Sequence, residues 1–460
     1  MPGNQYDAVV VGCGTGGSAF AIRARKLGLS VCVVDTKPRA RIGEKVCGDA
    51  VPRYHFDRLE KEADITPPRG DELGQIITGM KLIGPSRTRM VKVHEDGYTV
   101  NRHEFGQRLV NDVVDAGANL LDKHLVLGPI LEKGRIVGLR TKDKITRMER
   151  AIRASIVVDA SGVTATLRKA IEFPGRERGI HPRDLGICYR EVLKLKEPID
   201  EPDILEVIFD RSIAQGGYIW VFPKSDTVVN VGVGLTMSLG TSPLAAYRRF
   251  IKRDRIFNGA EVIAKGGGIV PMRKPVGSFV GDNFLLVGDS ACQVNPLHGG
   301  GLGYSMIGGC MAANTAAEAL AQDDVSYKAL WGYNHEYQTA IGKRHAALDV
   351  FRIMLNSLSN RDLDFGCSGN LFTEEDFFAI DKNGKLELSN AQKLIRGLRG
   401  LHHPTLMRSL MFAVKRMKAL KELYMAYPTT PEGLDSWTAR VEEEFEPVWQ
   451  RFGKSFEKID

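Results

Sequence analysis

The chain has 460 residues, of which 43% are hydrophobic and 26% charged, and its formal net charge is +7. This length allows two or three domains with a large core. The mild basic excess is spread along the chain without clustered basic runs and interleaved aromatics, so we expect no nucleic-acid partner. Charges or glycines interrupt every apolar stretch that approaches the length of a bilayer span, which excludes an integral membrane protein of the helical kind.

The seven cysteines include no Cys-x-x-Cys pair. We therefore expect no zinc or iron–sulfur site and a reducing compartment, with one disulfide left open. The first predicted strand begins within the first few residues, so we expect no signal peptide. The predicted location is cytoplasmic, either free or peripheral on the inner face of the cell membrane, to whose anionic surface the basic excess would be attracted.

A glycine-rich turn joins the first predicted strand, residues 6–11, to a helix. The order of glycines predicts a turn at the first, close backbone approach to a pyrophosphate at the second, and helix packing on the strand at the last. A second strand over residues 30–34 ends at an acid that suits ribose hydroxyls. The predicted dinucleotide-binding residues of this part are Gly12, Gly14, Thr15, Gly16, Gly17, Asp35 and Thr36.

Two later strands, residues 156–159 and 284–287, also end in small residues and an aspartate. NAD and FAD share the first fingerprint, but the later Gly-Asp pair resembles the ribityl-binding motif of the p-hydroxybenzoate-hydroxylase-like flavoproteins, which favours FAD. A helix starting after Gly299 would direct its N-terminus at the flavin and favour the anionic reduced state. The added cofactor residues are Asp159, Ala160, Ser161, Gly162, Gly288, Asp289, Pro296, Gly299, Gly300, Gly301 and Leu302.

Two further stretches narrow the prediction from flavoproteins in general to one family. Residues 45–50 read Lys-Val-Cys-Gly-Asp-Ala, and residues 218–223 read Tyr-Ile-Trp-Val-Phe-Pro. With residues 288–309 they resemble the geranylgeranyl reductases, most closely the archaeal digeranylgeranylglycerophospholipid reductases, over about the first three quarters of the chain. The resemblance implies reduction of isolated double bonds in prenyl chains by reduced FAD. It also implies cofactor contacts from Lys45, Val46, Cys47, Gly48 and Arg102, although Arg102 also reads as a surface arginine opening an amphipathic helix.

Strand alternation places Tyr218, Trp220 and Phe222 on one face, either as the wall of an apolar tunnel, with Pro223 at its end, or as core between sheets. An isolated alkene needs a proton as well as a hydride. We predict Cys47 as the donor, with Tyr218, His298 or water as alternatives. The plain alternatives are a small buried residue at Cys47 and a surface histidine at His298.

The predicted fold is α/β (α+β): a Rossmann-type FAD-binding domain, an antiparallel-sheet substrate domain and a C-terminal helical domain. The FAD domain would combine residues 1–72, 98–177 and 268–345. The substrate domain would combine 73–97 and 178–267, with strands at 204–209 and 227–235 and added strands within 75–94. Residues 346–460 read as helical around a loop near 362–370. The helix over 405–424 is basic and amphipathic, suited either to a membrane surface or to packing on its own domain.

The leading hypothesis is FAD-dependent reduction of geranylgeranyl chains in archaeal ether lipids or of geranylgeranyl diphosphate. The electron donor would be NAD(P)H or a ferredoxin-like protein, because the sequence has no second dinucleotide fingerprint. The alternatives are an aromatic hydroxylase of the same fold, using NAD(P)H and oxygen, and a non-catalytic prenyl-binding carrier. The carrier predicts a decayed FAD site, whereas all three signatures are intact here.

Overall fold

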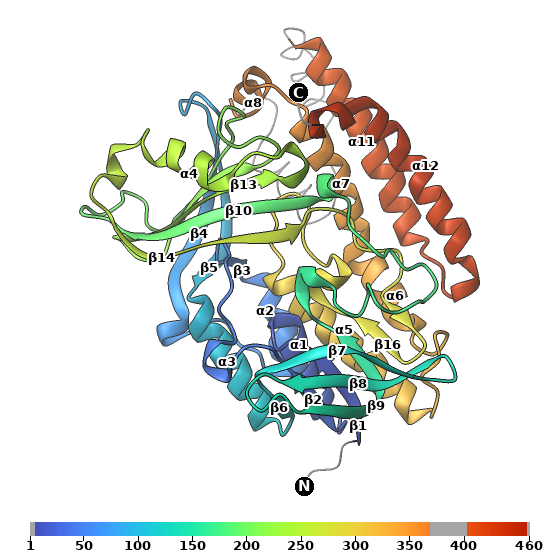
Figure 1. The fold of residues 1–460 in the computed structure, drawn as a ribbon. Helices are drawn as coiled ribbons and strands as arrows, with labels where there is room; N and C mark the ends of the chain where they lie inside the picture. Colours follow the sequence, from blue (N-terminus) through green and yellow to red (C-terminus); the bar gives the residue numbers. More distant parts are fainter. Residues whose placement is uncertain (1–4, 369–402, 458–460) are drawn as a thin grey trace.

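A computed structural model describes residues 5–368 and 403–457 of the chain. Within these residues the fold is mixed α/β, with two sheets of eight strands each and helices packed around them (Figure 1). One sheet lies beside the N-terminus and the other lies above it in this view, with the C-terminal helices along one side of both. The predicted fold class is confirmed.

The first sheet has the order β15-β16-β9-β1-β2-β6, and the β7–β8 hairpin extends it from β9. Its central pairs are parallel. Val9, Val10 and Val157 are fully buried, as expected of a parallel sheet that is covered on both faces, which explains the continuous apolar runs. Its strands are β1 (Gln5–Val11), β2 (Val31–Val34), β6 (Asn119–Leu121), β7 (His124–Glu132), β8 (Arg135–Asp143), β9 (Glu149–Asp159), β15 (Val280–Gly281) and β16 (Phe284–Leu286).

Four helices belong with the first sheet: α1 (Thr15–Lys26), α2 (Tyr54–Ala63), α3 (Arg102–Asp115) and α5 (Leu302–Ala321). The α1 and α5 helices cross closely because glycines face each other there. A Cβ added at Gly309 would lie 2.4 Å from the carbonyl oxygen of Gly16. This approach brings the N-termini of two helices to the same edge of the sheet.

The second sheet has the order β14-β10-β13-β12-β11-β4-β5-β3, antiparallel except between β11 and β4. Its strands are β3 (Ala50–Pro52), β4 (Leu73–Ile83), β5 (Met90–Val100), β10 (Leu185–Lys194), β11 (Ile204–Ile208), β12 (Tyr218–Pro223), β13 (Val228–Thr236) and β14 (Glu261–Pro271). The strands predicted near 75–94, 204–209 and 227–235 are therefore confirmed. The sheet also takes β3, the end of β5 and the end of β14, which we had predicted for the FAD domain.

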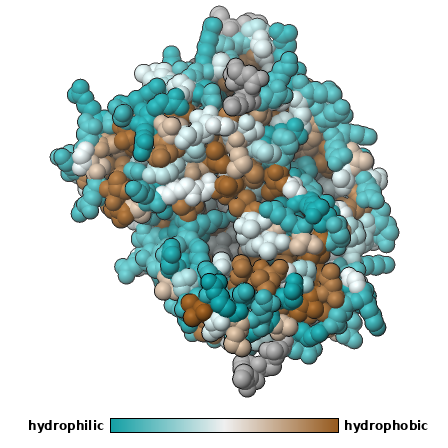
Figure 2. Space-filling view, in the orientation of Figure 1, coloured by the Kyte–Doolittle hydropathy of each residue, from teal (hydrophilic) through white to brown (hydrophobic). Residues whose placement is uncertain are grey.

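The two faces of the second sheet have different neighbours. Helix α4 (Pro243–Ile251) covers one face, and its Tyr247 and Phe250 share a core with Ile219 and Val231. The other face, which carries Trp220, looks toward the first sheet. Figure 2 shows hydrophobic surface over this sheet, where the edge strand β14 exposes Val262, Ile263 and Ile269.

The C-terminal part is helical, with α6 (Trp331–Tyr337), a π-helical turn (Gln338–Gly342), α7 (Lys343–Asn356), α8 (Asn360–Gly366), α11 (Pro404–Met425) and α12 (Leu434–Phe452). Helix α11 buries Leu406, Leu410 and Met417 against the protein, whereas Met411 is 68% exposed. The loop predicted near 362–370 is wrong up to Gly366, where α8 ends, and residues 369 and 370 lie outside the described residues. No helix in the described parts combines the length and apolarity that a membrane crossing requires.

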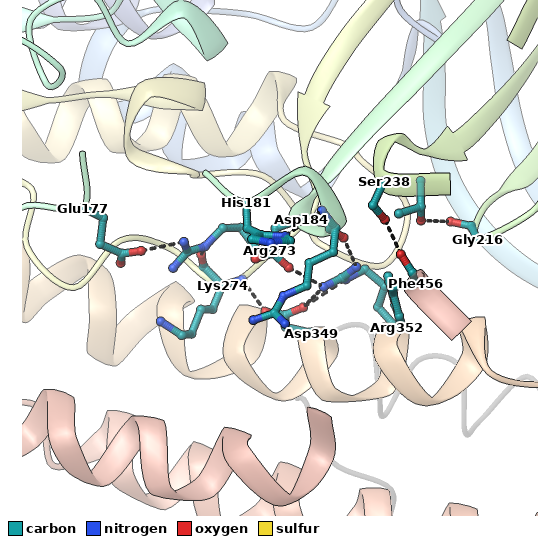
Figure 3. Close-up of polar contacts among 12 residues, drawn as sticks. Glu177, His181, Asp184, Gly216, Ser238, Arg273, Lys274, Asp349, Arg352 and Phe456 are labelled. Carbon is teal, nitrogen blue, oxygen red and sulfur yellow. Dashed lines mark hydrogen bonds and ion pairs between the residues drawn. The ribbon is translucent and has the colours of Figure 1, made fainter. Parts of the chain in front are cut away.

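A buried cluster of charges joins the C-terminal helices to the two sheets (Figure 3). Arg352 of α7 donates from Nη2 to the Oδ1 atoms of Asp349, at 2.7 Å, and Asp184, at 3.2 Å. The backbone N–H of Lys274 donates to Asp349 Oδ2 at 2.8 Å, and the Arg273 guanidinium pairs with Glu177 at 2.5 Å. The cluster therefore fixes α7, which borders the cavity described below.

Replacing Glu177 by glutamine should change how stability depends on pH. Burial opposes ionisation of this carboxyl, but the charges of Arg273 and Lys274 outweigh burial and lower its pKa to about 2. A depressed carboxyl pKa adds stability above the unfolded-state value of about 4.3, and this stability is lost as pH falls toward 2. Urea unfolding at several pH values should therefore show a steeper loss for the parent protein than for Glu177→Gln. Parallel profiles would contradict this; Glu172→Gln, at an exposed position, is the control.

Candidate active site

A cavity of about 820 Å³ lies between the carboxyl ends of the first sheet and the inner face of the second. One end is lined by the glycine-rich turns after β1, β9 and β16. The middle is lined by residues 45–50 and the aromatic side chains of β12, and the far end by α7, α8 and α11. A polar, glycine-rich cradle and an apolar tunnel are thus parts of one continuous space.

The first glycine fingerprint shapes the polar end. Gly12 has φ +98°, and a Cβ there would lie 2.5 Å from the carbonyl oxygen of Ala160. No atom lies within 4 Å of a Cβ placed at Gly14, which faces the cavity. Thr15 and Gly16 also line the cavity, and helix α1 begins at Thr15, so unpaired N–H groups lie on the cavity wall. Gly17 does not line it; its missing Cβ lets α1 approach Gly12.

Asp35 follows β2 on the rim of this polar end. Its Oδ2 accepts from the N–H of Cys13 at 2.8 Å and its Oδ1 accepts from the N–H of Lys37 at 2.8 Å. These bonds hold the carboxylate at the cavity, which Thr36 also lines. The arrangement suits an acid that accepts hydrogen bonds from a ribose.

Asp159 does not face the cavity, which corrects our prediction for this residue. Its carboxylate is fully buried and accepts from the backbone N–H groups of Ser161, Leu167 and Arg168 at 2.8 to 3.0 Å. A tight turn after a buried strand leaves N–H groups that need acceptors, and Asp159 supplies them. Ala160, Ser161 and Gly162 do line the cavity.

Asp289 and the N-terminus of α5 form the opposite wall. Asp289 Oδ2 accepts from Lys45 Nζ at 2.9 Å, and the charge of Asp289 raises the pKa of Lys45. The helix begins at Leu302, slightly later than predicted, with Gly301 as its N-cap and no side-chain cap. Gly288, Gly299, Gly300, Gly301 and Leu302 line the cavity. Pro296 is buried and is not among the described residues that line the cavity, which corrects the prediction that it contacts the cofactor.

Arg102 is the residue that best indicates which ligand the polar end of the cavity binds. It is the first residue of α3, is only 9% exposed, and lines the cavity. Its Nε and Nη1 atoms have no hydrogen-bond partner among the described residues. A buried guanidinium without acceptors is costly unless an anionic ligand pairs with it. With the open space at Gly14 and the two helix N-termini, this residue fits the diphosphate of FAD.

Cys47 lies at the junction of the polar end and the tunnel, where it is half-buried. Tyr218 also lines the cavity, but its hydroxyl donates to the carbonyl oxygen of His298 at 2.6 Å, and burial raises its pKa. His298 lines the cavity and accepts from the N–H of Gly300 at 3.1 Å through Nδ1. All three predicted proton donors therefore line one cavity, and the Tyr218 hydroxyl is the one that donates to a backbone carbonyl oxygen.

The aromatic side chains of β12 face the tunnel as alternation predicts. The rings of Tyr218 and Trp220 lie 6.1 Å apart between centroids, and those of Trp220 and Phe222 lie 6.4 Å apart. They line the cavity and also form a small core cluster with Val207, so the tunnel and core interpretations both apply. Pro223 points to the other face and is not among the described lining residues, which corrects its prediction as a substrate contact.

Sequence reasoning missed the far end of the tunnel. The residues there come from strands β4, β5 and β11, and from α7, α11 and the segment of α8 with the residue after it. The period-two apolar pattern of β4 could have indicated the first group, but no motif marks the second. They are Met80, Leu82, Val91, Leu205, Phe351, Leu355, Leu363, Cys367 and Leu406.

The fold and the site together define a FAD-dependent oxidoreductase with a large apolar substrate tunnel. Residues 7–172 match the family model for FAD dependent oxidoreductases, and residues 184–270 match the model for the geranylgeranyl reductase catalytic domain. The chain is 35% identical to the digeranylgeranylglycerophospholipid reductase of Sulfolobus acidocaldarius, over 98% of this chain and 99% of that relative. The chain therefore belongs to the family of digeranylgeranylglycerophospholipid reductases.

Other proteins resemble this chain either in sequence or in fold alone. A digeranylgeranylglycerophospholipid reductase of Methanococcoides burtonii is 32% identical over 78% of this chain and 86% of its own length. The crystal structure of a geranylgeranyl bacteriochlorophyll reductase-like protein from Thermoplasma acidophilum superposes with a TM-score of 0.74 at 23% identity, covering 89% of this chain and 99% of that one. The myxobacterial chondrochloren halogenase, at 18% identity and a TM-score of 0.65 over 94% and 99% of the two chains, shares the fold alone.

Replacing Arg102 by leucine should weaken FAD binding while the protein still folds. Charge-assisted hydrogen bonds to the cofactor would be lost, which predicts about a 10- to 100-fold rise in Kd. Flavin content after purification and titration of the apoprotein with FAD measure this. Arg108→Leu, on the same helix but ion-paired with Glu72 and outside the cavity lining, is the matched control. Equal FAD affinity in both variants would remove Arg102 from the cofactor site.

Proposed function

We propose that this chain reduces isolated C=C bonds in the geranylgeranyl chains of archaeal-type ether lipids. The observation that carries the proposal is the single cavity, in which a cradle suited to FAD continues into an apolar tunnel past Cys47 and Trp220. A tunnel of this kind suits a long prenyl chain, because apolar walls exclude water and favour apolar ligands. The names of the relatives support the same substrate class.

The residues of this chain have distinct tasks in that reaction. FAD, when bound and reduced, supplies a hydride. Arg102 and the N–H groups around Gly14 hold the anionic part of the cofactor. The β12 aromatics hold the prenyl chain against the junction. Cys47 gives a proton from its thiol to the alkene carbon that does not receive the hydride, and the dry tunnel keeps water from competing for that proton.

The substrate we favour is the ether phospholipid, with geranylgeranyl diphosphate as the second candidate. We propose that NAD(P)H or a ferredoxin-like protein supplies the electrons. We also propose peripheral contact with the inner face of the cell membrane through α11. Its Leu406 lines the tunnel, while its exposed Met411 and basic side chains such as Lys415 and Lys418 suit an anionic lipid surface.

The hydroxylase alternative needs a pocket that suits a phenol. The space beyond the FAD end is walled instead by aromatic and aliphatic side chains of β4, β11 and β12. The carrier alternative needs no cofactor, and a chain of this family with an intact cradle does not support it. Neither alternative is favoured.

The test is an anaerobic half-reaction. The purified holoenzyme is reduced chemically, mixed with a geranylgeranyl ether phospholipid, and followed by flavin absorbance and lipid mass spectrometry. Flavin reoxidation with lipid mass rising by pairs of hydrogens is the expected result. A flavin that stays reduced with unchanged lipid, yet reoxidises in air and adds oxygen to an aromatic compound, would contradict the proposal. Geranylgeranyl diphosphate in a parallel run decides between the two substrates.

Replacing Cys47 by alanine should slow lipid reduction by about 100-fold or more, the usual effect of losing a general acid. Flavin binding and reoxidation of the reduced flavin by air should not change. Cys47→Ser should keep a small residual rate, because a hydroxyl is a much weaker acid. The control is Cys32→Ala, a thiol buried in β2 outside the cavity lining. A Cys47→Ala enzyme at the parent rate would move the proton donor to water or His298.

A further inference from the structure

A buried asparagine links the cysteine loop to the aromatic strand. Asn230 lies on β13 and is fully buried. Its Oδ1 accepts from the indole N–H of Trp220 at 3.0 Å. Its Nδ2 donates to the carbonyl oxygen of Cys47 at 2.8 Å and to Asp49 Oδ2 at 2.8 Å. Both amide hydrogens are therefore used, and a flipped amide would place its oxygen against a carbonyl and a carboxylate, so the orientation is fixed.

The loop that Asn230 holds is otherwise constrained at only a few points. Asp49 has φ +71°, a conformation that non-glycine residues seldom adopt without support. Its Oδ2 also accepts from Lys224 Nζ at 3.2 Å, and its carbonyl oxygen accepts from the N–H of Val100 at 2.9 Å. A Cβ at Gly48 would lie 3.0 Å from the Phe222 ring, so the loop is pressed against the aromatic wall.

We propose that Asn230 is a positioning residue for the reduction. It fixes the backbone of Cys47 relative to the ring of Trp220, so that the thiol stays at the point where the prenyl chain passes the junction. The inference rests on the proposed function for its consequence in catalysis, but the holding of Cys47 itself does not depend on the substrate. None of the sequence motifs predicts this role, because Asn230 lies outside them, ten positions after Trp220 on the neighbouring strand.

Removing the amide has a defined physical effect. Leucine at position 230 has the same number and branching of side-chain heavy atoms, but it leaves the Trp220 N–H, the Cys47 carbonyl and one Asp49 contact without their partner. Unpaired buried polar groups are costly, so the loop is expected to shift until water or another group satisfies them. Asn230 does not line the cavity, and Arg102 and the turn at Gly14, which we propose hold the anionic part of FAD, lie outside the loop, so cofactor binding should be retained.

The experiment uses the FAD-loaded enzyme and two readouts. The first is the rate at which iodoacetamide alkylates Cys47, measured by peptide mass spectrometry, with the other cysteines as internal references. The second is lipid reduction in a single anaerobic turnover. In Asn230→Leu we expect the alkylation rate to change by about fivefold or more and lipid reduction to fall by about tenfold or more, with flavin content and air reoxidation unchanged.

The matched control is Asn334→Leu. Asn334 is also fully buried and also has both ends of its amide bonded, to Phe279 N–H at 2.7 Å and Ser278 Oγ at 3.0 Å, but it does not line the cavity. Its variant should leave both readouts at parent values. If Asn230→Leu does not fold, Asn230→Ser decides, because serine also removes the two donations from Nδ2 without adding an apolar side chain.

Parent-like alkylation and parent-like lipid reduction in the Asn230 variant would overturn the inference, as would equal losses in the Asn334 control. A double variant, Asn230→Asp with Asp49→Asn, restores a carboxylate–amide pair between the two positions but gives Cys47 no donor. Slow lipid reduction in that variant is the expected result, and full recovery would overturn the role of the Cys47 contact. A parent enzyme that reduces no lipid would refute the proposed function alone, since alkylation still decides whether Asn230 holds Cys47.

Discussion

A charged dinucleotide and an apolar chain have to meet in one protein cavity, and the two requirements conflict. Phosphates need N–H groups and cations, whereas a prenyl chain needs walls without unpaired polar atoms. In the proposed function, the carboxyl ends of the parallel sheet would hold the first and the inner face of the antiparallel sheet would hold the second. Residues 45–50 carry both kinds of lining in sequence, from Lys45 beside Asp289 to Ala50 against the β12 aromatics.

A buried set of hydrogen-bonded polar side chains lies at this junction. Lys224 and Asn230 both donate to Asp49 Oδ2, whereas Asp49 Oδ1 has no partner among the described residues and Asp49 also lines the cavity. Two nitrogens of Arg102, Nε and Nη1, have no acceptor among the described residues. This is expected of a buried arginine that pairs with an anionic ligand. Arg168 and Arg211 also have unpaired buried nitrogens, but Arg102 differs from them because it lines the cradle end of the cavity.

Local sequence signals predicted the parts of the site that depend on local backbone. Gly12, Gly14 and Asp35 follow from turns and strand ends, and the shared face of Tyr218, Trp220 and Phe222 follows from alternation. Asp159, Pro223 and Pro296 are predicted site residues that do not line the cavity. Their neighbours line the cavity, but which side of a turn or strand a residue faces is decided by the packing around it. The far end of the tunnel and Asn230 depend on contacts across long sequence separations, which no motif in one sequence reveals.

The central claim is that cofactor and prenyl chain share one cavity and meet between Cys47 and the aromatic wall. A crystal structure of the FAD-loaded enzyme with a reduced, saturated ether lipid tests it most directly. The account predicts density for a prenyl chain along Trp220 and Phe222, beside Cys47, with its far end under α7 and α8. Density for FAD in the cradle and for the lipid chain in a different groove would contradict it.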